Sequence, residues 1–285
     1  LLAAASREYR VDLPEPSWAE QDIEAVWGLA LESMGEAVVG AGVREVAAIG
    51  LSVHGEAVTP VDASLRPLRP TILGMDTRTD TQNEWLRERF GAKTLFERTG
   101  MPTHTPPPLP KQLRSRAHEP AVWTAADRFQ LVEDFHNARM TRVGATSACL
   151  ASRTQLFALA AGEWSTEILE VLELDARRLA EVAPSGTAVG RLRAELTDRL
   201  GLSSAPAVVT GGHDQACGAL GVGLTEPGLA MVSTGTAEVV EVALGSAVVS
   251  EPRYEGNISV YRATVPDLFL ATTLNHSGGL ALRWF

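Results

Sequence analysis

The spacing of hydrophobic and polar positions predicts a long helix near the start of the chain. Apolar residues recur every three or four positions at Ile23, Val26, Trp27, Ala30, Leu31 and Met34. This is the spacing of an amphipathic helix. We expect a strand over residues 8–13, then a capping box with Ser17 as N-cap and Glu20 three residues later. Gly40 and Gly42 are expected to end the helix.

Short apolar runs between turn residues predict strands along the rest of the chain. They cover residues 46–52, 57–62, 71–76, 205–212, 229–234 and 238–244, with a hairpin within 257–275. Residues 79–100 are predicted to be helical, and a proline-rich loop follows over 101–110. A further helix starts near His213 or Asp214. Strands that alternate with helices in this way predict an α/β fold.

Composition narrows the kinds of partner. The formal net charge of −10 disfavours binding to nucleic acid or to an acidic membrane surface, because either polyanion would be repelled. Two cysteines, Cys149 and Cys217, give no disulfide framework and fit a reducing compartment, so we expect a cytoplasmic protein. The sequence has no apolar run of ~20 residues. The chain starts and stops abruptly and is interpreted as a segment of a longer protein.

A polar cluster follows the glycine pair at the end of the predicted strand over 205–212. Open α/β sheets bind ligands at the carboxyl ends of their strands, and a helix N-terminus stabilises a negative charge. Asp214 is therefore a candidate general base for a substrate hydroxyl, with Gln215 beside it, and an N-cap role for Asp214 is the alternative. A metal shared by His213 and Asp214 is disfavoured, because adjacent helical residues point about 100° apart. No metal ligand is assigned.

Other polar residues are candidates for substrate binding. Glu56 and His54 lie in a turn between strands, where Glu56 either accepts from two hydroxyls of a polyol or stays solvated. Asp76 and Arg78 face the same side of a strand, as a site pair or as an ordinary ion pair. His104, in the proline-rich loop, faces either a cleft or the surface.

The turn between two of the predicted strands is a candidate for nucleotide binding. Thr234, Gly235 and Thr236 separate two apolar runs. Backbone N–H groups and hydroxyls in such a turn can hold phosphate oxygens. An ordinary hairpin turn is the alternative.

The succession of segments is more specific than any one of them. The chain contains, in order, LPEPSWAEQD, GLSVHGEAVTPVD, ILGMDTRT, TGMPTHTPPPLPK, LASRTQLF, APSGTAVGRL, GGHDQACGALGVG and VSTGTAEVV. This series runs along essentially all 285 residues and resembles the FGGY carbohydrate kinases, which include glycerol kinase, xylulokinase, gluconokinase and ribulokinase. The resemblance implies the actin-like, ribonuclease H-like ATPase fold, with the active site between two α/β domains.

The resemblance also implies a reaction and roles for the candidate residues. The γ-phosphoryl group of ATP, with Mg²⁺, would be transferred to a hydroxyl of a sugar, polyol or sugar acid. Asp214 matches the general base of the family, and Gln215 matches a neighbour that contacts the substrate. The turn over 234–236 matches the second phosphate loop. Glu56 matches a ligand of substrate hydroxyls in the glycerol-kinase-like members.

The resemblance finally implies how the chain is divided. Residues 1–224 would form the N-terminal, sugar-binding domain without its first strands, and residues 225–285 would begin the nucleotide-binding domain. The first phosphate motif and the adenosine motif would lie outside the segment, so the segment alone is expected not to catalyse. Gly55 replaces an arginine of glycerol kinases, and Gly74 replaces a tryptophan of many members, which predicts a wider pocket. A non-catalytic sugar-binding or regulatory remnant is the alternative, and a homodimer stays open.

Overall fold

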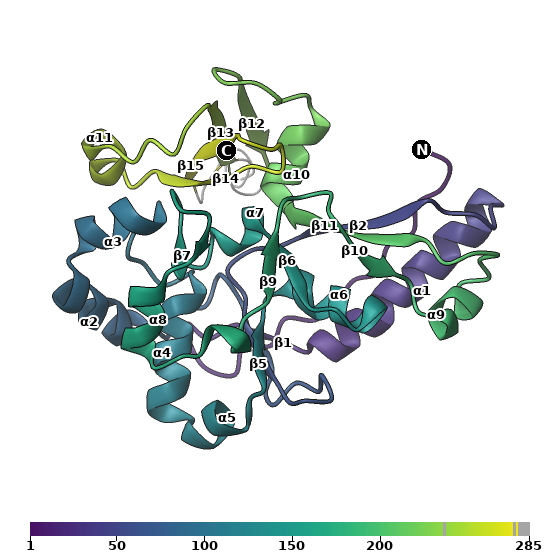
Figure 1. Ribbon diagram of the computed structural model, residues 1–285, viewed down its shortest axis with the longest axis horizontal. Coiled ribbons are helices and arrows are strands. Elements are labelled where there is room, and N and C mark those ends of the chain that lie inside the picture. Colours follow the sequence, from purple (N-terminus) through teal and green to yellow (C-terminus); the bar gives the residue numbers. More distant parts are fainter. Residues whose placement is uncertain (236–237, 276–277, 279–285) are drawn as a thin grey trace.

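The computed structural model describes residues 1–235, 238–275 and 278. Helices and strands alternate along the chain (Figure 1), as expected for an α/β protein. The helices are α1 (Ile23–Ala41), α2 (Asp80–Phe90), α3 (Ala92–Thr99), α4 (Pro108–His118), α5 (Pro120–Ala125), α6 (Val132–Thr141), α7 (Ala148–Ala151), α8 (Thr166–Leu172), α9 (Ala194–Arg199), α10 (Asp214–Gly221) and α11 (Glu251–Glu255), with a short 3₁₀ helix η1 (Ala176–Arg178). The strands are β1 (Glu20–Gln21), β2 (Ala48–Val53), β3 (Thr59–Val61), β4 (Thr71–Ile72), β5 (Arg128–Gln130), β6 (Ala145–Ser147), β7 (Phe157–Ala158), β8 (Glu163–Trp164), β9 (Glu181–Ala183), β10 (Ala188–Arg191), β11 (Ala207–His213), β12 (Ala230–Thr234), β13 (Glu238–Leu244), β14 (Ser259–Arg262) and β15 (Phe269–Asn275).

A three-stranded sheet organises the first part of the molecule. Its strand order is β10–β11–β2, and β11 runs antiparallel to β10 and parallel to β2. Helices α1, α6 and α9 pack against this sheet, because Leu31, Met140 and Leu196 form one buried cluster with Val208 of β11. The apolar spacing that predicts α1 therefore corresponds to its contact with the sheet.

Helix α1 begins later than the sequence predicts. Its N-cap is Asp22, whose carboxylate accepts from two backbone N–H groups of the first turn. The predicted capping box is wrong, because Ser17 has a φ of 68° and Glu20 belongs to β1. The predicted strand over 8–13 is also wrong, since that segment forms one isolated bridge, to Glu20. The predicted end is confirmed: Gly42 caps the helix in the left-handed conformation.

The glycine pair before α10 lies at a close approach of two strands. The register between β11 and β2 shifts between Val209 and Gly212. A Cβ atom on Gly211 would lie 1.7 Å from the carbonyl oxygen of Leu51, so no larger residue fits there. The N–H of Gly211 donates to the carboxylate of Glu133, in the first turn of α6, over 2.5 Å. Buried Glu133 thus fixes the path of the chain just before it enters α10.

A second sheet lies beside the first part of the molecule. Its strand order is β12–β13–β15–β14, and every neighbouring pair is antiparallel. In Figure 1 it lies above the rest of the chain, close to α7 and α10. The N–H of Val260 donates to the carbonyl of Gly100 over 2.7 Å, and the N–H of Arg262 donates to Ser152 Oγ over 3.0 Å. Strand β14 is therefore bonded directly to loops of the first part.

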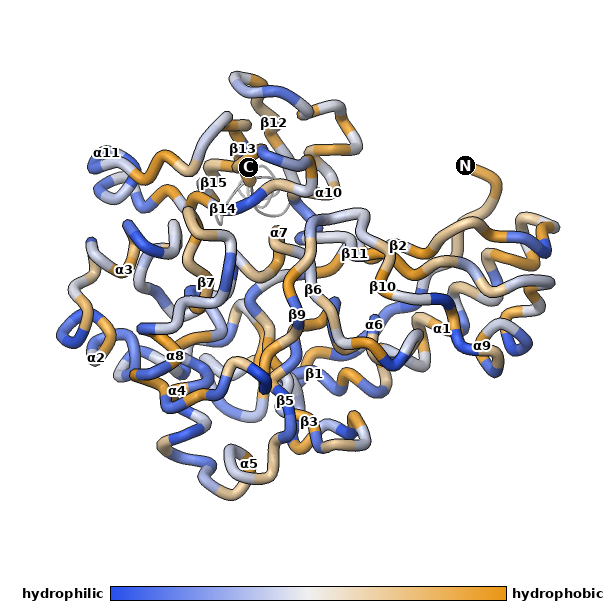
Figure 2. Tube along the Cα trace, in the orientation of Figure 1, coloured by the Kyte–Doolittle hydropathy of each residue, from blue (hydrophilic) through white to orange (hydrophobic). Residues whose placement is uncertain are grey.

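The core is divided into several buried clusters. One of them joins α2, β5 and α8 through Leu86, Phe129 and Ile168. Figure 2 shows that the outer helix α2 is largely hydrophilic, whereas hydrophobic stretches follow the strands between the helices. Among the residues that the structure describes, no helix is long and apolar enough to cross a membrane.

Candidate functional site

The candidate residues meet where two parallel strands end. Strands β2 and β11 are hydrogen-bonded neighbours, and Val53 is paired with His213. The chain continues from β2 into His54 and Glu56, and from β11 into Asp214. Because parallel strands present their carboxyl ends at one edge of a sheet, the two predicted groups of polar residues lie together there.

Glu56 forms a buried ion pair that the sequence did not predict. Its Oε1 atom accepts from Arg153 Nε over 2.6 Å and also from Arg153 Nη2. Burial opposes the charge, but Arg153 and His213 outweigh it and hold the pKa of Glu56 at about 2, against an ordinary 4.5. The alternative of a solvated glutamate is therefore wrong. Oε2 makes no hydrogen bond within the described part of the chain, so it stays available as an acceptor.

Lys111 holds the loop that carries Glu56. Its Nζ atom donates to the carbonyl oxygens of Glu56 and Pro106, over 2.5 Å in each case. Burial lowers the pKa of Lys111 to about 7, while Glu56 and Asp76 act in the opposite direction. A neutral amine has two N–H donors, and these two carbonyls would use both. Lys111 thus ties the turn after β2 to the proline-rich loop.

Asp214 is the first residue of α10 and lies at the mouth of this group. Its side chain is 49% exposed, and its Oδ1 atom is 3.2 Å from Nε2 of the buried His213. His213, not Asp214, is the N-cap, so the capping alternative for Asp214 is wrong. Oδ1 also accepts from the N–H of Gln215 over 2.7 Å. Asp214 is therefore a solvent-accessible carboxylate held at a helix N-terminus.

Three histidines surround the carboxylates as neutral rings. Burial lowers the pKa of His54, although Asp214 and Glu56 favour its charged form. Burial, with help from Arg153, lowers the pKa of His104 to about 4 and also lowers the pKa of His213. His104 Nε2 is buried and makes no hydrogen bond to any residue that the structure describes, so the surface alternative for His104 is wrong. Near neutral pH these rings supply polar atoms but no charge.

The comparison with known proteins assigns the chain to a family. The sequence profile of the FGGY family of carbohydrate kinases, N-terminal domain, matches residues 1–221. The chain belongs to the FGGY family of carbohydrate kinases. Its actin-like ATPase fold, expected from the order of the segments, is confirmed by the structures it resembles.

Relatives of this FGGY chain include kinases for different carbohydrates. It is 30% identical, over an alignment of 294 residues, to the xylulose kinase of Lactococcus lactis subsp. lactis (strain IL1403), covering 100% of this chain and 56% of that protein. It is also 30% identical, over an alignment of 254 residues, to the glycerol kinase of Nostoc sp. (strain PCC 7120 / SAG 25.82 / UTEX 2576). That alignment covers 87% of this chain and 50% of the glycerol kinase. The structure of a xyloylose kinase from Brucella ovis superimposes with a TM-score of 0.92 at 26% identity, covering 98% of this chain and 57% of that one. The chain thus spans about half the length of the relatives it matches.

Asp76 and Arg78, two of the predicted substrate-binding residues of the FGGY chain, form an ion pair with each other. The guanidinium of Arg78 donates to the carboxylate of Asp76 over 2.6–2.9 Å, and Asp76 also accepts from the N–H of Ala19 over 2.7 Å. Arg78 also donates to Glu20 and lies 3.7 Å from the ring centroid of Trp18. Both side chains are almost fully buried. The ordinary ion-pair alternative describes this arrangement, and it anchors the segment before α1.

The predicted phosphate turn is described in part. Thr234 ends β12 and pairs with Glu238 of β13, and both Thr234 and Gly235 are exposed. Thr236 lies outside the described residues. The turn therefore connects two antiparallel strands, as expected, and its role in nucleotide binding stays a prediction. Gln215 is half-buried beside Asp214.

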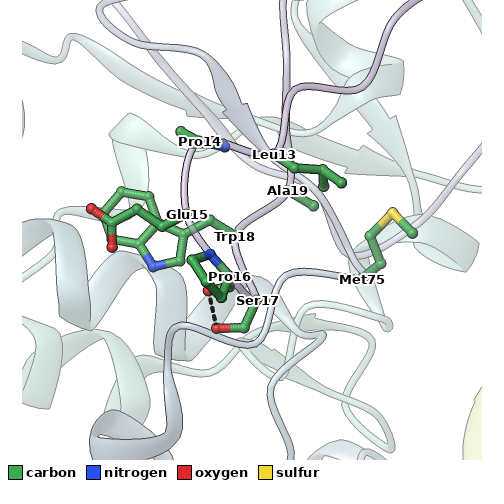
Figure 3. Close-up of a pocket in the computed structure, with 8 residues that line it drawn as sticks. All are labelled: Leu13, Pro14, Glu15, Pro16, Ser17, Trp18, Ala19 and Met75. Atoms are coloured by element: carbon green, nitrogen blue, oxygen red, sulfur yellow. Dashed lines mark hydrogen bonds between the residues drawn. The ribbon is translucent and has the colours of Figure 1, made fainter.

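A surface pocket of about 450 Å³ lies elsewhere on the chain (Figure 3). It is lined by Leu13, Pro14, Glu15, Pro16, Ser17, Trp18, Ala19 and Met75. Leu13 and Met75 are largely exposed. None of the candidate residues lines this pocket, so it is not assigned to the site.

Three residues that shape the site were not assigned to it from the sequence. Lys111, Glu133 and Arg153 have ionisable side chains buried inside the protein, yet each lies in a segment read only as loop, strand or helix. Arg153 is 97 positions from its partner Glu56, and Glu133 is 78 positions from Gly211. A charged residue within a run of small and apolar residues, such as LASRTQLF, was the available signal.

Proposed function

We propose that the chain is part of an ATP-dependent carbohydrate kinase in which Asp214 is the general base. The substrate hydroxyl would donate its proton to Asp214 as the hydroxyl oxygen attacks the γ-phosphorus of ATP. The observation that carries this proposal is the half-exposed carboxylate of Asp214 against the ring of His213, at the end of β11, where the neighbouring strand β2 also ends and leads into Glu56. Phosphoryl transfer depends mainly on positioning and charge neutralisation, so one accessible base in a fixed frame is sufficient.

The residues around Asp214 fit a polyhydroxy ligand. Glu56 Oε2 and Asp214 Oδ2 make no hydrogen bond within the residues described, so both can accept from hydroxyls. Arg153 Nη1 and His104 Nε2 are buried and have no hydrogen-bond partner among the residues that the structure describes, which is rare unless a ligand or water completes them. These groups come from four different segments. They supply both donors and acceptors for sugar hydroxyls.

The charge balance favours a neutral sugar or polyol among the expected substrates. Arg153 is neutralised by Glu56, and Lys111 donates to two carbonyl oxygens. The free acceptors of the site belong to carboxylates, so a sugar acid would bring a further negative charge toward them. We therefore propose a ketose or polyol, of the kind named in the xylulose and glycerol kinase relatives, ahead of a sugar acid.

We propose that Mg²⁺ binds together with the nucleotide. The described residues contain no group of three His, Cys, Asp or Glu side chains that could hold a metal ion. Mg²⁺ in phosphoryl-transfer sites is commonly held by one or two carboxylates and by substrate phosphates. Mg²⁺ would neutralise phosphate charge, and Asp214 would stay free to accept the proton of the substrate hydroxyl. The turn at Thr234 and Gly235 would contact the phosphates of ATP.

The proposal assigns sugar binding and nucleotide binding to different parts of the chain. Residues 1–224 would bind the sugar, and residues 225–285 would begin the nucleotide-binding domain. Because the chain spans about half the length of its relatives, residues 1–285 alone would not catalyse. The two free cysteines, Cys149 and Cys217, fit a protein that works in the reducing cytoplasm, where ATP is available.

Replacement of Asp214 in the full-length protein tests the assignment. We expect Asp214→Asn to lower kcat by about 10²–10⁴-fold, the usual loss for a general base, while the sugar Kd changes little. Asp198→Asn, on the exposed face of α9, is the matched control and should leave kcat unchanged. A kcat reduced less than about tenfold by Asp214→Asn would contradict the assignment.

A further inference from the structure

The second sheet places two buried polar side chains behind the site. Tyr261 on β14 is fully buried, and its hydroxyl donates to Glu241 Oε1 on β13 over 2.8 Å. The second oxygen, Glu241 Oε2, accepts from Thr272 on β15 over 2.5 Å. Three neighbouring strands therefore hold one buried carboxylate that uses both of its oxygens. Burial raises the pKa of Glu241 and that of Tyr261.

The ring of Tyr261 contacts two groups of the candidate site. The guanidinium carbon of Arg153 lies 4.6 Å from the ring centroid, within the range of a cation–π interaction. The imidazole of His213 meets the same ring edge-on, with centroids 5.9 Å apart and planes at 86°. Arg153 is the ion-pair partner of Glu56, and His213 lies against Asp214. One aromatic ring thus touches the neighbours of both carboxylates.

The backbone on each side of Tyr261 is fixed to the first part of the molecule. The N–H of Val260 donates to Gly100, and the N–H of Arg262 donates to Ser152 Oγ. Ser152 directly precedes Arg153. Because both neighbours of Tyr261 are bonded across the boundary, the ring cannot withdraw from Arg153 without breaking backbone contacts.

We infer that Tyr261 is a positioning residue for the proposed reaction. Its ring, anchored by Glu241, holds Arg153 against Glu56 and His213 against Asp214. The sugar end of the site is therefore completed by the second sheet. Glu241 lies on β13, the strand that follows the proposed phosphate turn, so the two ends of the site share one strand. The inference rests on the proposed function, because it concerns the binding of the sugar that is phosphorylated.

The test compares two tyrosines in the full-length protein. Tyr261→Leu removes the ring and should raise the sugar KM about tenfold, the loss of a buried cation–π contact, while the KM for ATP stays unchanged. Tyr261→Phe keeps the ring and should raise the sugar KM only about threefold, because Glu241 loses a donor but Arg153 keeps its contact. Tyr254 is the control, because its ring packs on Phe96 and, within the described residues, makes no ring contact with Arg153 or His213. Tyr254→Leu and Tyr254→Phe should leave both KM values unchanged.

A double-mutant cycle separates positioning from general stability. In a Glu56→Gln background, Tyr261→Leu should add little further loss of sugar affinity, because the pair that Tyr261 holds is already weakened. Additive losses, or equal increases in both KM values, would overturn the inference and leave Tyr261 a structural residue. If Tyr261→Leu does not fold, the same cycle is run with Tyr261→Met, which also lacks the ring but adapts better to irregular core space. If the wild-type protein phosphorylates no sugar, both the proposed function and this inference are overturned. If the wild type is active and Tyr261→Leu leaves the sugar KM unchanged, the inference alone is overturned.

Discussion

Removal of the Arg153 charge tests whether the centre of the site is an ion pair enclosed by protein. Arg153→Met keeps much of the length of the side chain but removes all its donors. Glu56 would then remain buried with no charged partner on its Oε1 atom. A buried carboxylate in that position is strongly destabilising, or it takes up a proton. We therefore expect both a loss of stability and a change in its pH dependence.

The magnitude follows from the pKa of Glu56. Burial acts to raise that pKa, yet Arg153 and the other cations hold it at about 2, against an ordinary 4.5. At about 1.4 kcal/mol per pH unit, this difference corresponds to about 3 kcal/mol of folding free energy at neutral pH. The same pair raises the pKa of Arg153, and because this is one interaction it is counted once. Arg153→Met should therefore destabilise the full-length protein by about 3 kcal/mol.

The pH dependence has a defined sign. A carboxyl group with a lowered pKa stabilises the fold fully above its ordinary pKa of 4.5, and this contribution is lost as the pH falls toward 2. In Arg153→Met the pKa of Glu56 rises, because burial is no longer offset by its main partner. The stability difference between wild type and variant should therefore be largest near neutral pH and should narrow as the pH falls.

Urea denaturation at about pH 7 and about pH 4 measures both effects. Arg177→Met is the matched control, since it breaks the exposed ion pair of Arg177 with Asp175, 2.5 Å apart, and should change stability little. A loss below about 1 kcal/mol for Arg153→Met would place the pair in the range of surface ion pairs. That result, or a difference that does not narrow in acid, would refute the reasoning.

Two further substitutions test sugar binding by Glu56 and the support that His213 gives to Asp214. Glu56→Gln should raise the sugar KM by about tenfold with kcat little changed, and an unchanged KM across a panel of sugars would remove Glu56 from the site. Gly55→Ala places a Cβ atom 2.7 Å from Cδ2 of His213, so the imidazole must move and kcat should fall. Gly218→Ala, with nothing within 4 Å of the added atom, is its control, and equal kcat in both variants would contradict this account.

The position of the site was predictable in part, because polar residues follow two predicted strands and these strands turn out to be parallel neighbours in the sheet. Predicted strands end at residues 52 and 212, and polar residues follow each of them within two positions. The sequence does not state that these two strands are neighbours, but their parallel pairing brings His54, Glu56 and Asp214 to one edge.

The partners of these residues were not predictable, because they come from distant parts of the chain. Arg153 reaches Glu56 from the segment after α7, and nothing in the local spacing connects the two. The predicted start of helix α1 was wrong for a related reason. Ser17 and Glu20 have the spacing of a capping box, but the buried carboxylate of Asp76 accepts from the N–H of Ala19, and Ser17 has a positive φ that a helix N-cap does not adopt. Tertiary hydrogen bonds thus override a local signal.

Two glycines next to the site show why a missing side chain does not always create space. Gly74 was expected to widen the pocket, yet a Cβ atom there would lie 3.3 Å from Cβ and 3.5 Å from Oε2 of Glu56. The volume that a larger residue would occupy is thus taken by Glu56 itself, and at Gly55 the corresponding volume is taken by His213. Neither glycine has a positive φ, so close approach rather than backbone conformation requires them. The selectivity of the site therefore depends on the side chains that fill these positions, and a larger residue at either glycine would act by displacing Glu56 or His213.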